Sequence, residues 1–198
     1  TGGRATGTWS ATGVTIDSRS VAPGDLFIAI RGDNMDGHRF VADALENGAA
    51  AAMVASDWPD APASAPLIIV DDTDNGMAAL ARAARARTSA RIVGVTGSVG
   101  KTSTKEMLAL ALGSLGKTVA TEGNLHNHWG LPLSLSRLPA DAAFGIFELG
   151  MNHAGEIEPL SKILQPEVSI ITTVESVHLE HFENEEGIAD AKAEIFAG

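Results

Sequence analysis

The stretch 93–107, VGVTGSVGKTSTKEM, places a glycine-rich loop between an apolar run and a helical pattern. Residues 91–96 are typical of a strand, and 101–115 carry apolar residues at helical spacing. Gly97 and Gly100 let the backbone turn so that its amides converge, and the following helix N-terminus adds positive partial charge. This order of strand, loop and helix predicts an α/β layer with a phosphate-binding site.

The predicted ATP-binding residues are consecutive: Thr96, Gly97, Ser98, Val99, Gly100, Lys101, Thr102 and Ser103. Lys101 supplies a point charge for the β- and γ-phosphates, and the Thr102 hydroxyl is a suitable Mg²⁺ ligand. Val95 stands where the strict eight-residue pattern has its first glycine. The alternative is an ordinary strand-to-helix turn with a solvated lysine, which this context disfavours. The loop predicts nucleotide binding but not the reaction.

Strands and helices alternate along most of the chain. We expect strands at 14–17, 26–30, 51–55, 67–70, 91–96, 117–121, 143–149 and 168–174, and helices at 38–47, 73–88, 101–115, 155–164 and 184–197. This alternation predicts the α/β class, with a small N-terminal α/β domain followed by a mostly parallel P-loop sheet flanked by helices. The expected domains are 1–88 and 89–198, and the second, with four strands, looks incomplete.

The composition narrows the class of protein. The chain has no cysteine, which excludes disulfides and thiolate metal sites. Its formal net charge of -11 argues against a nucleic-acid partner. It lacks an apolar run long enough for a membrane span, and no signal peptide is visible. We expect a soluble, cytoplasmic protein with no membrane partner, and a monomer, although the sequence does not define the oligomeric state.

Two segments beyond the loop are candidate metal sites. FGIFELG puts Glu148 at the carboxyl end of an apolar strand, the edge where open α/β sheets bind ligands. VHLEHF puts His178, Glu180 and His181 after the next strand, although two histidines at this spacing are a weak signal. The alternatives are a solvated glutamate and solvent-facing histidines.

Lys192 lies on the apolar face of the last predicted helix, with Ile188, Ile195 and Phe196 at helical spacing. A lysine on such a face either extends to solvent or is functional, and the first is the commoner outcome. If it is buried, its ammonium form is disfavoured.

Several motifs together resemble the Mur ligase family of peptidoglycan synthesis. They are TGSVGKTSTKEM, GNLHNHWGLPLSL, ELGMNHAGEIE and VHLEHFENEEGIADAKAEIF, preceded by TIDSRSVAPGDLFIAIRG, DGHRF and ALENGAAAAMV. The resemblance runs from about Val14 to the last residue and is closest to members that add D-alanyl-D-alanine. The family uses the glycine loop without the earlier glycine, so Val95 is normal for it.

The resemblance implies roles for individual residues. Lys101 and the loop amides would bind ATP, and Thr102 and Glu148 would hold one of two Mg²⁺ ions. His178 matches a ligand of the second Mg²⁺, and Lys192 matches a lysine that the family carbamylates to support that metal. The resemblance thus implies catalytic roles for Lys101, His178 and Lys192. The implied substrate-binding residues are Ser18, Arg19, Asp36, Gly37, His38, Asn124 and Asn127. His126 replaces an asparagine of the family pattern, so its role is open.

The resemblance implies an ATP-dependent amide ligase. The carboxylate of UDP-MurNAc-tripeptide would attack the γ-phosphate to give an acyl phosphate, which the amine of D-alanyl-D-alanine would then attack. Residues 1–88 would bind the uridine nucleotide and 89–198 would bind ATP. The family's C-terminal domain, which helps to bind the dipeptide, is not in this sequence, so we expect residues 1–198 alone to be inactive.

Other functions remain open at this point. A sibling ligase would add a single amino acid, and a folylpolyglutamate-type enzyme would share only the P-loop domain. A non-catalytic P-loop nucleotide-binding module leaves Lys192 and the first 87 residues unexplained, and a structural interaction domain requires an accidental glycine loop. The sequence does not specify the third residue of the tripeptide.

Overall fold

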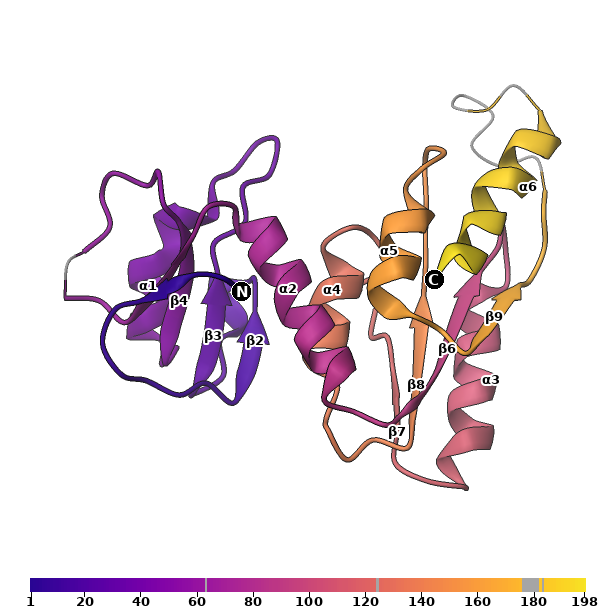
Figure 1. Cartoon of the computed structure of the whole chain (residues 1–198), viewed down its shortest axis with the longest axis horizontal. Helices are drawn as coiled ribbons and strands as arrows, with labels where there is room; N and C mark the ends of the chain where they lie inside the picture. Colours follow the sequence, from indigo (N-terminus) through magenta and orange to yellow (C-terminus); the bar gives the residue numbers. More distant parts are fainter. Residues whose placement is uncertain (63, 124, 176–181, 183) are drawn as a thin grey trace. The chain divides into compact units, whose positions relative to one another are not determined.

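The computed structural model describes residues 1–62, 64–123, 125–175, 182 and 184–198. The chain forms two compact units, Thr1–Leu80 and Ala81–Gly198 (Figure 1). The expected boundary was at residue 88, eight residues later. The last turns of the connecting helix belong to the second unit because Arg85 donates to the carbonyl of Leu164 and Arg87 to those of Ser136 and Leu138.

The first unit is a five-stranded sheet in the order β1-β5-β4-β3-β2. The strands are β1 (Arg4–Ala5), β2 (Gly13–Thr15), β3 (Asp25–Ile28), β4 (Ala51–Ala55) and β5 (Leu67–Val70), and the helices are η1 (Ser18–Ser20), η2 (Gly37–Phe40), α1 (Val41–Glu46) and α2 (Thr73–Ala86). Strands β2 to β5 are parallel to their neighbours, whereas β1 is antiparallel to β5. The two-residue β1 was not predicted because it is too short to show alternation.

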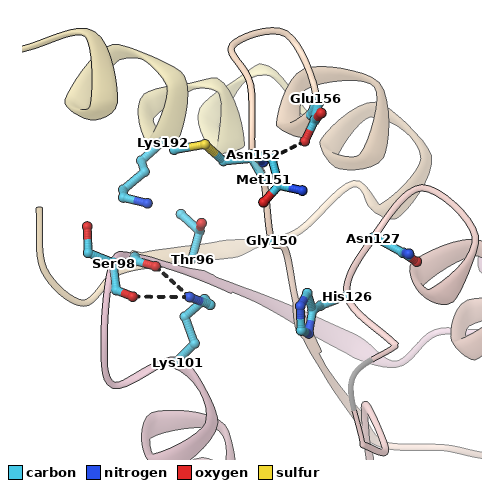
Figure 2. Close-up of a pocket in the computed structure, with 11 residues that line it drawn as sticks. Thr96, Ser98, Lys101, His126, Asn127, Gly150, Met151, Asn152, Glu156 and Lys192 are labelled. Atoms are coloured by element: carbon cyan, nitrogen blue, oxygen red, sulfur yellow. Dashed lines mark hydrogen bonds between the residues drawn. The ribbon is translucent and has the colours of Figure 1, made fainter. Parts of the chain in front are cut away.

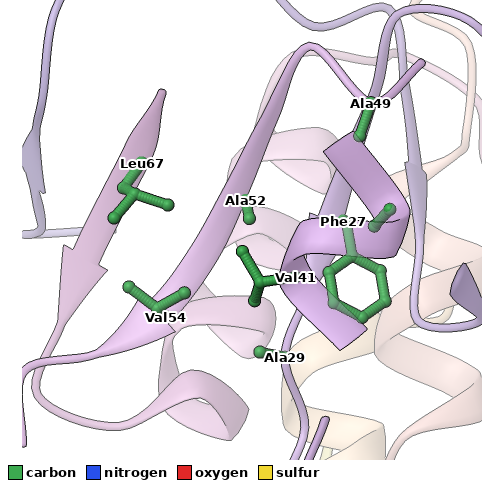
Figure 3. Close-up of a cluster of buried hydrophobic side chains, with 8 residues drawn as sticks. Phe27, Ala29, Val41, Ala49, Ala52, Val54 and Leu67 are labelled. Atoms are coloured by element: carbon green, nitrogen blue, oxygen red, sulfur yellow. The ribbon is translucent and has the colours of Figure 1, made fainter. Parts of the chain in front are cut away.

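Both faces of this sheet are buried, as expected for parallel strands. Phe27 on β3, and Ala52 and Val54 on β4, point to the face that α1 covers with Val41 and Ala44 (Figure 3). On the other face α2 approaches so closely that a side chain at Gly76 would meet the Met53 sulfur at 2.6 Å.

The second unit is a fully parallel sheet in the order β7-β8-β6-β9. Its elements are β6 (Arg91–Thr96), α3 (Lys101–Gly113), β7 (Thr118–Ala120), α4 (Gly130–Ser136), β8 (Phe144–Glu148), α5 (Ile157–Leu164), β9 (Val168–Ile171), α6 (Glu185–Ala193) and η3 (Glu194–Ala197). The predicted α/β class is confirmed.

Helices cover both faces of this second sheet. Val93 and Val95 on β6 pack against α3 through Leu108, Ala109 and Leu112. On the opposite face, a side chain at Gly94 would touch Ile195 of η3 at 3.3 Å. No helix among the described residues is long and apolar enough to cross a membrane.

Helix α4 was not predicted from the sequence. All seven of its residues are buried, so it has no polar face to produce an amphipathic pattern. Pro132 also disfavours a helix in the sequence, but the helix begins at Gly130 and proline is tolerated in a first turn. The predicted last helix is also divided: α6 ends at Ala193, and the chain continues as the 3₁₀ helix η3.

The cluster in Figure 3 provides a test of the first unit. Phe27→Ala should lower the free energy of unfolding by about 3–5 kcal/mol, because it removes a ring that is 1% exposed. The measurement is urea denaturation. Met35→Ala, at a side chain 59% exposed, is the control and should change stability by less than about 0.5 kcal/mol. Equal effects of the two substitutions would contradict this description of the core.

Candidate phosphate-binding site

The site lies at the carboxyl edge of the second sheet. Strand β6 pairs in parallel with β8 and β9, with Val95 opposite both Glu148 and Ile170. Because the three strands end at one edge, the glycine loop after β6, Glu148 of β8 and the chain after β9 come together there.

The loop between β6 and α3 depends on two glycines. Gly97 has φ of 141° and Gly100 has φ of 83°, both in the region that favours glycine. Thr172, just after β9, lies so close that a Cβ on Gly97 would be 1.9 Å from its Oγ1. The chain after β9 also holds the loop, since Ser98 donates its amide to the Thr173 carbonyl. This explains why the predicted strand 168–174 ends at Ile171.

Helix α3 begins at Lys101, so its first amides point out of the helix towards the loop. The Lys101 ammonium curls back into the loop and donates to the Gly97 carbonyl at 2.7 Å (Figure 2). Burial lowers the pKa of Lys101, and Glu148 partly opposes this effect. The arrangement offers glycine-loop backbone, a helix N-terminus and a cation at one point, which suits a phosphate group. Ser103, next to Thr102 in the first turn of α3, is exposed.

Thr102 and Glu148 lie together, with Thr102 Oγ1 3.3 Å from Glu148 Oε2. The Glu148 side chain is buried, and its Oε1 atom makes no hydrogen bond with the described residues. A hydroxyl beside a carboxylate with unused acceptor capacity fits Mg²⁺, which prefers oxygen ligands. No cluster of three or more His, Asp or Glu side chains forms within the described part of the chain. Mg²⁺ sites commonly include phosphate oxygens, which a bound nucleotide would supply next to Thr102 and Glu148.

Lys192 lines the same cavity and is 3% exposed. Its neighbours Ile188 and Ile195 are fully buried, as the pattern predicted, whereas Phe196 is 65% exposed because η3 turns it away. Burial, with a smaller contribution from the charge of Lys101, lowers the pKa of Lys192 to about 8. An appreciable fraction of this amine is therefore neutral near physiological pH.

The cavity has a volume of about 280 Å³ (Figure 2). It is lined by Thr96, Gly97, Ser98, Lys101, His126, Asn127, Gly150, Met151, Asn152, Glu156 and Lys192. His126 lies against Gly150, whose amide donates to the His126 carbonyl at 2.8 Å, and its Nδ1 is buried without a hydrogen-bond partner in the described structure. The Asn127 side-chain oxygen accepts from the amide of Gly130, the first residue of α4. Asn124, His178, Glu180 and His181 lie outside the described residues.

Sequence reasoning missed Lys105, which is buried on α3 and lies 3.4 Å from Glu148 Oε1. Met151, Asn152 and Glu156 also line the cavity; they lie in the ELGMNHAGEIE motif, but no role was predicted for them individually. A signal for Lys105 existed, because it precedes Leu108, Ala109 and Leu112 at helical spacing on the face of α3 that packs on the sheet.

In the first unit, the candidate substrate residues follow two parallel strands. Ser18 and Arg19 form η1 after β2, and Asp36, Gly37 and His38 follow β3 at the same edge of that sheet. The Arg19 side chain is exposed and makes a two-pronged contact with Asp17, whose pKa it lowers.

His38 is enclosed within this unit. Its side chain is buried, its Nδ1 lies 2.5 Å from Asp36 and its Nε2 accepts from the Ala55 amide. Both ring nitrogens are therefore engaged within the chain, and the ring holds the 31–38 segment against β4.

Comparisons with known proteins match most of the chain to one family. Residues 95–198 match the Mur ligase middle domain, and residues 10–86 match a domain described as "Mur ligase family, catalytic domain". The chain belongs to the Mur ligase family. The family resemblance predicted from the motifs is confirmed.

Individual Mur ligases resemble it along most of its length. A Bacillus subtilis relative named UDP-N-acetylmuramoyl-tripeptide–D-alanyl-D-alanine ligase is 39% identical over 94% of this chain and 41% of its own. MurF from Acinetobacter baumannii superposes with a TM-score of 0.84, at 38% identity over 92% of this chain and 40% of its own. MurF from Thermotoga maritima, solved in complex with ADP, gives 0.80 at 35% identity over 92% of this chain and 42% of its own. The chain thus spans about 40% of the length of these relatives.

The close approach of Thr172 makes Gly97 the most sensitive position of the loop. Gly97→Ala should reduce nucleotide affinity by a factor of about 100 or more, because its Cβ has no space and the φ is unfavourable. Isothermal titration with ADP measures this. Gly113→Ala in α3 is the matched control, since its Cβ meets nothing within 4 Å, and it should bind normally. Normal binding by Gly97→Ala would show that the loop does not contact the nucleotide in this form.

Proposed function

We propose that this chain is the nucleotide- and metal-binding part of an ATP-dependent ligase that adds D-alanyl-D-alanine to UDP-MurNAc-tripeptide. The observation that carries the proposal is the cavity in which Lys101 of the glycine loop and the buried Lys192 face the same space. A phosphate loop alone suits many nucleotide-binding proteins, including a non-catalytic module. A second lysine, buried and easily deprotonated, favours a ligase of this family. The names of the relatives support the choice of acceptor.

The reaction divides into two steps. A carboxylate oxygen of the tripeptide attacks the γ-phosphorus, the bond to the bridging oxygen breaks, and ADP leaves. The amine of D-alanyl-D-alanine then attacks the acyl carbon, the C–O bond breaks, and phosphate leaves as the nitrogen loses a proton. Phosphorylation turns a carboxylate, which has no good leaving group, into a reactive acyl donor.

The residues of the site would handle the charge in this reaction. Lys101 and the first amides of α3 would bind the β- and γ-phosphates and offset the charge that develops during transfer. Thr102 Oγ1 and Glu148 Oε2 would hold Mg²⁺, which brings the anionic groups together and stabilises their charge. Asn127 lines the cavity and would contact the substrate. His178 and Asn124 retain the roles that the resemblance implies, a second-metal ligand and a substrate contact.

Lys192 would act as a carbamate. Its neutral amine would form a bond to carbon dioxide and release one proton, and the resulting anion would serve as a carboxylate-like ligand for a second Mg²⁺ ion. Burial among apolar side chains favours this step because it lowers the pKa of the amine.

In the first unit, Ser18, Arg19, Asp36 and Gly37 would contact the uridine nucleotide, with the exposed Arg19 guanidinium available for a phosphate. His38 would hold the segment in place, because both of its ring nitrogens are engaged.

The acceptor is tested by assay of the full-length protein with UDP-MurNAc-tripeptide, ATP and Mg²⁺. D-Alanyl-D-alanine should give phosphate release and an amide product, whereas single amino acids should give neither. Lys101→Met should lower the rate by a factor of about 100 or more, because it removes a cation from the developing charge. Product formation with a single amino acid instead would support a sibling ligase, and nucleotide binding without any product would support the non-catalytic module.

Carbamylation is tested by ¹³C NMR of protein kept under ¹³CO₂ at fixed partial pressure. With a pKa of about 8, the neutral fraction of Lys192 rises from about one tenth at pH 7 to about half at pH 8, so a carbamate signal should grow over this interval. Lys192→Arg should remove the signal. Lys162→Arg, at an exposed lysine paired with Glu158, should leave it unchanged. A signal that survives Lys192→Arg would reject the assignment.

A further inference from the structure

Lys105 is a buried lysine that has no role in the proposed reaction. Its side chain is 3% exposed and lies one helical turn after Lys101 on α3. Its ammonium has three partners: the Thr121 carbonyl at 2.6 Å, Glu106 Oε1 at 2.9 Å and Glu148 Oε1 at 3.4 Å. These lie after β7, on α3 and at the end of β8.

Stability alone is a weak reason for a lysine at this place. Withdrawing an ammonium from water costs several kcal/mol, and apolar replacements of buried ion pairs are often neutral or stabilising. Burial by itself lowers the pKa of Lys105, but its contacts with Glu106 and Glu148 outweigh burial and raise it. The ammonium lies between two carboxylates, those of Glu106 and Glu148.

The two oxygens of Glu148 have different surroundings. Oε1 lies near the Lys105 ammonium, and Oε2 lies 3.3 Å from the Thr102 hydroxyl. The Glu148 amide donates to Thr121 Oγ1, while Lys105 bonds the Thr121 carbonyl. Lys105 thus contacts the side chain of Glu148, and Thr121 accepts a hydrogen bond from its backbone amide.

We propose that Lys105 is a positioning residue for the magnesium–nucleotide complex. It holds Oε1 of Glu148 so that Oε2 faces Thr102 and the phosphate loop, and it does not itself touch the nucleotide. The 3.4 Å contact lacks hydrogen-bond geometry, so it orients the carboxylate without using all of its acceptor capacity. This inference rests on the proposed binding of Mg²⁺ and ATP at Thr102 and Glu148.

The test measures ATP affinity by isothermal titration, first with EDTA and then with Mg²⁺. The ratio of the two affinities is the magnesium gain. In Lys105→Met, affinity in EDTA should stay within about twofold of the starting protein, because the loop and Lys101 are unchanged. The magnesium gain should fall by a factor of about 10 or more, as is typical when a partner of a metal ligand is removed. A purely structural role would weaken both affinities together.

Lys117→Met is the matched control. It removes an exposed lysine paired with Asp141 in the same unit and should leave the magnesium gain unchanged. If thermal melting shows that Lys105→Met does not fold, Lys105→Arg replaces it. Arginine keeps the charge but cannot place one compact ammonium among three acceptors, so its magnesium gain should fall by about threefold or more.

The possible outcomes separate the two proposals. If the unmodified protein shows no magnesium gain, the proposed function fails. If the unmodified protein shows a gain and the folded Lys105 variant retains it, only the inference about Lys105 is overturned. That variant is Lys105→Met, or Lys105→Arg if Lys105→Met does not fold.

Discussion

The parallel pairing of β6 between β8 and β9 is the constraint on which the site depends. Pairing of Val95 with both Glu148 and Ile170 brings three strand ends to one edge. The loop after β6 then lies beside the carboxylate that ends β8 and beside Thr172 and Thr173 after β9. A displacement of β8 by one residue would turn Glu148 to the other face of the sheet, because side chains alternate along a strand.

Three lysines gather at this edge although the chain as a whole is acidic. The formal net charge is -11, yet Lys101, Lys105 and Lys192 are all wholly or partly buried close to the edge. Each has a different environment. Lys101 bonds loop carbonyls, and Lys105 is balanced by carboxylates. Lys192 has no ion pair within the described residues, and burial, with the charge of Lys101, lowers its pKa to about 8. Short-range contacts, and not net charge, thus decide what the cavity attracts.

Much of this arrangement was predictable because it is encoded in short segments. The glycine loop is contiguous, and Gly97 and Gly100 have the positive φ values that such a loop needs. Glu148 was identified because it ends an apolar strand, and Lys192 because it interrupts an apolar helical face. Helix α4 and strand β1 were not predicted, since a wholly buried helix and a two-residue strand have no periodic pattern.

The sequence by itself determined the α/β class, the phosphate loop and the family resemblance, because each depends on residues close together in the chain. Only the tertiary structure decided which side chains meet. The ammonium of Lys105 lies beside Glu148, 43 positions later, only because α3 packs on the sheet. Both ring nitrogens of His38 are engaged because the β3–α1 connection folds against β4. Such contacts arise from packing between segments that are distant in the sequence, so no local sequence pattern predicts them.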